Sequence, residues 1–181
     1  MTYTVGAKKS ITISEEKKIH SELIFEWSNT EMSQNYQLSG PYSFGFHYQI
    51  TQGYTNRGQW IGSGIGYGGN SQHLEYRIYY PKGSTFLCIG RNNPDNNYIY
   101  AQAINSNTNE TAIKYTHAFK ANYYFGATTT YFITKSLSAT AGAIFDLIIN
   151  PVYNTRDENQ ETIGTSELRN WNFKFGIKYR L

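Results

Sequence analysis

The chain has 181 residues, enough for one domain with a single core or for one closed barrel. Its 17 Tyr, 10 Phe and 3 Trp, with 16 Gly and only 4 Pro, favour strands and turns over helices, because aromatic side chains suit a pleated surface. The formal charge of +3 is small and the basic residues are scattered, so nucleic-acid binding has little support. We therefore expect an all-β protein.

The single cysteine, Cys88, excludes an internal disulfide, which fits a reducing compartment and equally an envelope protein without disulfides. No stretch approaches the roughly 18 consecutive apolar residues of a transmembrane helix, and the start MTYTVGAKKS lacks the apolar core of a signal peptide. The simplest interpretation is a cytosolic protein, and the second is that a leader has been removed. Low mean hydropathy is compatible with a membrane barrel, because the strands of a barrel alternate in polarity.

The first predicted elements along the chain are short strands of alternating polarity. They are HSELIFEW (20–27), PYSFGFHYQI (41–50), QWIGSGIGYGG (59–69) and LEYRIYY (74–80). In the first of them, Leu23, Phe25 and Trp27 alternate with Glu22 and Glu26. Residues 85–105 form either one strand with a broken middle or two strands around the turn-forming NNPDNN.

Three longer alternating segments follow, at 115–133, 136–149 and 171–181. Ordinary strands run about 3 to 10 residues, whereas a membrane strand needs about 9 to 11 for the bilayer and can continue beyond it. The last segment, WNFKFGIKYRL, alternates without a fault, with aromatic or aliphatic residues on one face and Lys174 and Lys178 on the other.

Short and long connections alternate between these segments. Residues 81–84 and 134–136 are tight, whereas 29–40, 105–111 and 150–167 are longer. Counted from residue 19, this gives eight strands with the alternation that is typical of outer-membrane barrels. Residues 1–18 are then an arm, a plug or an extra strand, and ten strands result if residues 2–13 pair with their neighbour.

On these features, residues 19–181 resemble a small bacterial outer-membrane β-barrel of the eight-stranded outer-membrane protein superfamily. The resemblance implies a closed antiparallel up-and-down transmembrane barrel in a Gram-negative outer membrane. It also implies three partners: outer-membrane lipid, the barrel-insertion machinery and another envelope protein. In the family, alternate residues of the last strand resemble an assembly signal, and the matching positions here are Phe173, Phe175, Ile177, Tyr179 and Leu181. Leu181 departs from the Phe with which the family usually ends.

The physics of a membrane favours the same architecture. Every backbone N–H and C=O must be paired in hydrocarbon, so strands can cross only as a closed sheet, with apolar residues facing lipid and polar residues facing the lumen. Closure would make the first and last strands neighbours, so we expect Glu22 and Glu26 to pair with Lys174 and Lys178. An eight-stranded barrel is filled by side chains, so we expect no open pore.

Four sequence features could carry chemistry, and for each of them we favour a structural role. His47 with Ser43, and His73 with Ser71 and Glu75, lack the spacing signature of a nucleophile, so hydrogen-bonding residues are the better interpretation. GIGYGG (64–69) matches a phosphate loop but precedes a predicted strand where the fingerprint needs a helix, so relief of crowding is preferred. RNNPDNN (91–97) lacks the acidic density of a calcium site and is better interpreted as a turn. The fourth, the polar stretch 153–167, is a candidate recognition surface for a protein or a glycan.

The leading functional hypothesis is a non-enzymatic outer-membrane barrel that acts as a scaffold, docking subunit or adhesin through its loops, with no cofactor and no metal. One alternative is an outer-leaflet lipid-modifying enzyme in which His47 or His73 meets a Ser and a carboxylate. The other is a soluble β-sandwich or jelly-roll lectin, whose apolar faces would pack against each other.

Overall fold

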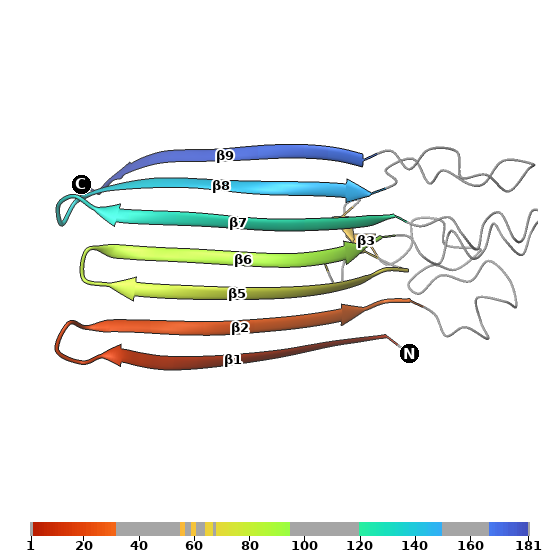
Figure 1. Cartoon of the computed structure of the whole chain (residues 1–181), viewed down its shortest axis with the longest axis horizontal. Helices are drawn as coiled ribbons and strands as arrows, with labels where there is room; N and C mark the ends of the chain where they lie inside the picture. The colour runs from red at the N-terminus through yellow and green to blue at the C-terminus, as the bar shows by residue number, and fades with distance from the viewer. Residues whose placement is uncertain are drawn as a thin grey trace, which may run out of the picture.

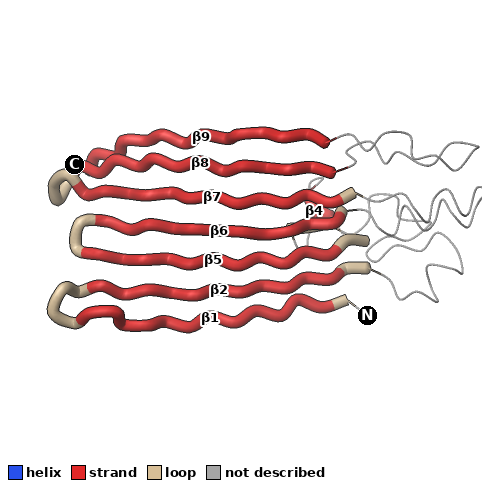
Figure 2. The backbone as a smooth tube through the Cα atoms, in the orientation of Figure 1, coloured by secondary structure: helices blue, strands red, loops and turns tan. Residues whose placement is uncertain are grey.

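In the computed structural model, residues 2–31, 55–56, 59–60, 64–66, 68–94, 120–149 and 167–180 are described, and the fold reported below is that of these residues. They form a seven-stranded antiparallel sheet and a separate two-stranded hairpin (Figures 1 and 2). The sheet contains β1 (Tyr3–Ser14), β2 (Ile19–Asn29), β5 (Asn70–Tyr80), β6 (Gly83–Asn93), β7 (Ala121–Phe132), β8 (Leu137–Ile149) and β9 (Glu167–Tyr179). The hairpin consists of β3 (Thr55–Asn56) and β4 (Gln59–Trp60). The described part of the chain contains no helix that could cross a membrane.

The strand order in the sheet is β1-β2-β5-β6-β7-β8-β9, with every neighbouring pair antiparallel. This confirms the all-β, antiparallel up-and-down prediction. The predicted closure and the strand count of eight are not observed, because the sheet has seven strands and β1 and β9 are its open edges. Residues 3–14 supply a strand in front of the predicted first strand, and the predicted strand 41–50 lies outside the described residues.

The predicted segment 59–69 is not one continuous strand. Gln59–Trp60 belong to the short hairpin, and residues 64–65 form a turn. Gly66 and Gly68 have φ values of 77° and 73°, in the left-handed region that side chains disfavour. Gly66 and Gly68 therefore allow the chain to change direction. The alternation of glycines in the sequence 59–69 does not correspond to one continuous strand here.

Tight turns join three pairs of strands at one end of the sheet, where β9 also ends (Figure 1). In the β1–β2 turn, the Lys17 amide donates to Ser14 Oγ at 3.2 Å and the Lys18 amide donates to the Glu15 carbonyl at 3.1 Å. Residues 81–82 and 133–136 form the other two turns, as the sequence predicts. The strand ends that flank the longer connections lie together at the opposite end of the sheet (Figure 1).

The register divides the side chains into two faces, because directly paired residues point the same way. One row across the polar face runs through Glu22, Arg77, Phe86, Thr128, Gly142 and Lys174. The adjacent row on the apolar face runs through Leu23, Tyr76, Leu87, Ala127, Ala143 and Phe173.

Burial does not follow the usual rule for a globular domain. Among the described residues, Ala121 is the only buried hydrophobic residue, whereas Ser21, Ser28 and Thr30 are buried polar residues. The apolar side chains of the sheet therefore do not form a core.

Candidate functional site

A chain of hydrogen-bonded side chains crosses the centre of the polar face. Arg77 donates from Nε and Nη2 to the two carboxylate oxygens of Glu75, at 2.6 and 3.0 Å. His73 Nε2 lies 3.6 Å from Glu75 Oε2, and His73 Nδ1 lies 2.8 Å from the Tyr124 hydroxyl. A bidentate Arg–carboxylate pair fixes both partners in orientation, so this chain holds β5 and β7 side chains in one arrangement.

The contact between His73 and Tyr124 spans the strand between them, β6. Gly90 is paired with His73 on one side and with Tyr124 on the other. A Cβ atom on Gly90 would lie 2.3 Å from the Tyr124 ring, so only glycine leaves room for the ring there. The Tyr124 ring consequently reaches over β6 and stacks at 5.9 Å from the His73 ring.

Glu22 is the centre of a second polar group, between β1, β2 and β5. Lys8 Nζ lies 2.7 Å from Glu22 Oε1, and the Tyr79 hydroxyl donates to Glu22 Oε2 at 3.2 Å. The neighbouring Glu26 accepts a hydrogen bond from Ser28 Oγ at 3.4 Å.

The expected proximity of Glu22 and Glu26 to Lys174 and Lys178 is not observed. β2 already has β1 and β5 as its two neighbours, and β9 is at the opposite edge of the sheet. Lys174 pairs in register with Gly142 and Lys178 with Ser138. The extra strand β1 supplies Lys8 where the sequence-based register expected the last strand.

Among the described residues, no element covers the apolar face. On it, Phe173, Phe175, Ile177 and Tyr179 lie along β9, where Phe175 is 79% and Ile177 81% exposed. Leu181 lies outside the described residues. Exposed apolar residues continue across the sheet to β1, and further members are Val5, Ile11, Leu23, Phe25, Trp27, Leu74, Leu87, Ile89 and Phe125. A continuous apolar surface of this extent on a soluble monomer is unusual and indicates a contact surface.

Aromatic rings group on the loop-side half of this face. Phe125, Phe145 and Trp171 lie on three neighbouring strands, with ring centroids 5.3 Å apart for the first two and 5.0 Å apart for the last two. Trp171 also stacks at 6.1 Å on Phe173. Charged residues on this face lie near its borders. Lys9 on the edge strand β1 is paired in register with Leu23, and Arg91, Arg169 and Glu167 lie at the loop-side end of the sheet.

Of the two histidines considered as catalytic bases, His73 lies within the described residues and His47 does not. His73, Ser71 and Glu75 share the polar face of β5, but both ring nitrogens of His73 face Tyr124 and Glu75. In register, Ser71 pairs with Ser28 and Asn92. A nucleophile needs a hydrogen bond to its base, so the described geometry supports a structural network at His73. His47 and Ser43 lie outside the described residues, and the enzyme hypothesis stays a prediction for them.

The GIGYGG segment leads into β5, not into a helix, so the phosphate-loop interpretation does not hold. Its glycines bind the end of β2 instead. Thr30 Oγ1 donates to the Gly66 and Gly69 carbonyls at 3.0 and 3.1 Å, and the Gly69 amide lies 3.1 Å from the same oxygen. The buried Thr30 therefore fastens the two ends of the connection between β2 and β5.

Only part of the RNNPDNN segment is described, and Arg91–Asn93 lie in β6. Nearby, four buried side-chain oxygens have no hydrogen-bond partner among the residues that the structure describes; they belong to Asn70, Asn92, Asn93 and Asn122. Within the described residues, no group of three His, Cys, Asp or Glu side chains is placed to hold a metal ion. The polar stretch 153–166 lies outside the described residues.

Sequence reasoning missed the partners in both polar groups, namely Tyr124, Gly90, Arg77 and Lys8. A signal existed for Arg77, which follows Glu75 at the spacing that places both on one face of a strand. No local signal links Tyr124 to His73, because their contact depends on the pairing of three strands. Comparison with protein-family models, with curated protein sequences and with solved structures gave no match.

Proposed function

We propose that this chain is an integral membrane β-sheet protein of the outer-membrane barrel type, which acts as a structural or docking subunit through its loops. The observation that carries the proposal is the inverted distribution of side chains. Large apolar residues are exposed along one face from β1 to β9, while Ser21, Ser28 and Thr30 are buried, and the carboxylates of Glu22 and Glu75 are paired and only 18% and 15% exposed. This arrangement is stable only if the medium at the apolar face is itself apolar.

The dimensions of the sheet agree with this proposal. Its strands are 11 to 13 residues long. At about 3.3 Å per residue, twelve residues span about 40 Å, or about 28 Å when tilted by about 45°. The apolar band of outer-membrane barrels is about 25 Å tall, so the strands are long enough to cross a bilayer.

The apolar face is the main argument against a sandwich lectin. A sandwich requires a second sheet about 10 Å away, with interdigitating side chains. Among the described residues the only other sheet is the two-stranded hairpin, and Phe175 and Ile177 keep about four fifths of their surface exposed. Lipid acyl chains are the partner that fits an extended, uncovered surface.

The proposal requires a partner for each edge strand, because unpaired backbone groups of β1 and β9 cannot remain in hydrocarbon. Closure on another strand would satisfy this requirement during insertion, with the barrel-insertion machinery as the partner during assembly. A barrel interior filled by side chains is expected for eight strands in a closed sheet. The described sheet is open and has seven strands, so the expectation of no pore does not carry over to it.

The role of the loops follows from the arrangement of the connections. Three tight turns lie at one end of the sheet, and the strand ends that lead to the longer connections gather at the other (Figure 1). In a membrane, this arrangement presents the long connections together on one side, where they can contact another envelope protein. The paired charged groups of the polar face act as internal structure and need no substrate.

The test is refolding from urea by dilution into neutral detergent micelles, with dilution into detergent-free buffer as the control. We expect a β-type circular dichroism spectrum only in detergent, and a gel mobility that changes on boiling. A β spectrum in plain buffer, with no mobility change on boiling, would contradict membrane insertion.

A further inference from the structure

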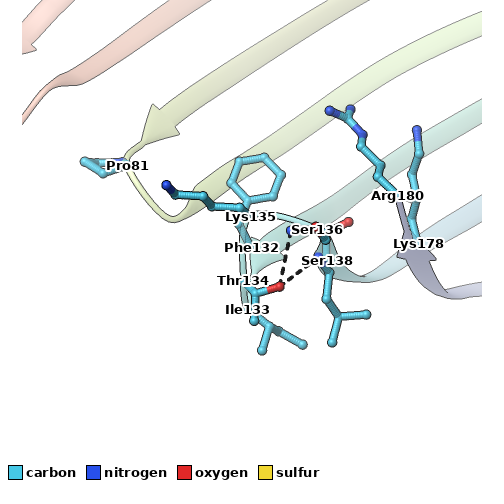
Figure 3. A pocket seen from close by; sticks show the side chains of 10 residues that line it. Pro81, Phe132, Ile133, Thr134, Lys135, Ser136, Ser138, Lys178 and Arg180 are labelled. Atoms are coloured by element: carbon cyan, nitrogen blue, oxygen red, sulfur yellow. Dashed lines mark hydrogen bonds between the residues drawn. The ribbon is translucent and has the colours of Figure 1, made fainter.

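A second surface lies at the turn end of the sheet, away from the polar groups around Glu22 and Glu75. It is a pocket of about 470 Å³ between the β5–β6 turn, the β7–β8 turn and the end of β9 (Figure 3). Pro81 and Phe132 form apolar parts of its wall, and Lys135, Lys178 and Arg180 supply its charges. Among the described residues, no acidic side chain lines the pocket.

The backbone around the pocket is fastened by hydrogen bonds. The Thr134 hydroxyl accepts from the Ser136 and Leu137 amides at 3.2 and 3.0 Å (Figure 3). The Arg180 amide donates to the Ser136 carbonyl at 2.8 Å, and the Phe132 amide donates to the Lys82 carbonyl at 2.8 Å. The two turns and the end of β9 are thus already ordered in the absence of a ligand. This order lowers the entropic cost of binding.

Two of the three cations extend to the same side because of the strand geometry, whereas the Lys135 side chain extends in another direction (Figure 3). Lys178 and Arg180 are two positions apart, and their side chains extend from the end of β9 to the same side (Figure 3). Lys135 is in the neighbouring turn, on the other side of the same backbone contact. Within the described residues, none of these three cations forms an ion pair.

We propose that this pocket binds a phosphate group, carried either by an anionic lipid at the membrane surface or by a soluble compound. Arg180 offers the planar fork that binds phosphate oxygens in pairs, and the two lysines add point charges. Phe132 and Pro81 give an apolar surface beside the charges, where the organic part of the ligand can lie. This pocket is at the end of the sheet opposite the long connections, so its ligand approaches from the side that the docking role does not use.

The experiment is isothermal titration calorimetry of the full chain in neutral detergent micelles, with two separate probes. One is inorganic pyrophosphate, and the other is phosphatidylglycerol mixed into the micelles. The test variant is K178Q/R180Q. The control is K17Q/K18Q, which removes the same charge from the β1–β2 turn at the same end of the sheet.

We expect the wild-type chain to bind at least one probe. K178Q/R180Q should weaken that binding about tenfold or more, because each charge-assisted contact to phosphate contributes strongly. K17Q/K18Q should change it by less than about twofold, because exposed charges more than about 10 Å away are screened. Binding of pyrophosphate would identify a soluble ligand, and binding of the lipid alone would identify a headgroup.

Two results would overturn the proposal. One is the absence of binding to both probes, and the other is an equal loss of binding in both double variants, which would indicate attraction by net charge. Circular dichroism and gel mobility that match the wild type show that the variants fold. If K178Q/R180Q does not fold, the single substitution K135Q in the β7–β8 turn tests the pocket instead. If the chain folds in plain buffer and the membrane proposal fails, the pyrophosphate titration in buffer still tests the pocket.

Discussion

Two residues on the last strand, β9, illustrate how differently the two faces of the sheet are built. On the polar face, Asn172 donates to Asp146 of the next strand at 2.6 Å and accepts a hydrogen bond from Asn170 at 3.4 Å. On the apolar face, the adjacent Phe173 is 66% exposed and contacts mainly other rings. The polar face is stabilised by specific contacts between side chains. No element in the described part of the chain covers the apolar face, so its stability depends on the surrounding medium.

A charge placed on the apolar face should have the strongest effect on stability, if that face contacts lipid. In a membrane, Phe173→Arg should destabilise the protein by about 2 to 4 kcal/mol if it lies near the bilayer midplane. In water it should have almost no effect, because Phe173 is already exposed. The measurement is urea unfolding of the protein refolded in micelles or vesicles.

The matched control for this substitution is Asn172→Arg, on the opposite face one residue earlier. It introduces the same side chain beside Asp146, where a cation has a partner. Equal unfolding midpoints for the two variants would contradict lipid contact at Phe173.

The second prediction concerns packing on the polar face. A Cβ atom on Gly126 would lie 2.7 Å from Ile144 Cγ1 and 3.0 Å from the Ala143 carbonyl oxygen. Gly126→Ala should therefore reduce the free energy of unfolding by about 1 to 3 kcal/mol through overpacking. The control is Gly176→Ala on β9, where no atom lies within 4 Å of the added methyl group. If both variants unfold at the same urea concentration, the polar face is less closely packed than described.

A smaller effect is expected from one hydroxyl group. Tyr124→Phe removes the partner of His73 Nδ1 and should lower stability by about 1 kcal/mol. Tyr123→Phe makes the same chemical change on the exposed apolar face and should leave stability unchanged. Chemical denaturation of the two variants side by side measures the difference. A larger loss for Tyr123→Phe would show that the assignment of the two faces to this strand is reversed.

The smallest expected effect is at the Lys8–Glu22 ion pair, where Lys8 is half exposed. Lys8→Gln should lower stability slightly at low ionic strength, and the difference should disappear near 1 M salt because exposed charges are screened. The neighbouring variant Lys9→Gln removes a charge from the other face and should show no such loss. A difference that persists in high salt would mean that Lys8 stabilises by packing and not by charge.

Sequence alternation predicted the faces where it was uninterrupted. Residues 171–181 alternate without a fault, and Phe173 to Tyr179 lie on the apolar face as expected. The sequence leaves residues 1–18 open between an arm, a plug and a strand. In the structure the consecutive Lys8 and Lys9 interrupt the period of two, although the backbone of β1 continues through them. In GIGYGG the opposite occurred: the spacing suggested a strand, but the positive φ of Gly66 and Gly68 bends the chain.

The contacts of the polar groups could not be predicted from local pattern. Tyr124 and His73 are 51 positions apart, and their meeting depends on β6 between them and on the absence of a side chain at Gly90. Lys8 reaches Glu22 only because residues 3–14 form a strand beside β2. Each contact therefore follows from strand order, which short-range periodicity does not contain.

The odd number of strands in the described sheet has a consequence for how the proposed membrane protein can be labelled. Because seven strands alternate in direction, β1 begins at the end of the sheet where the long connections gather, and β9 ends beside the tight turns (Figure 1). In a closed vesicle, probes attached before β1 and after β9 would report from opposite compartments. An even-stranded barrel would place both probes in the same compartment, so a pair of impermeant dyes distinguishes the two architectures without a further structure.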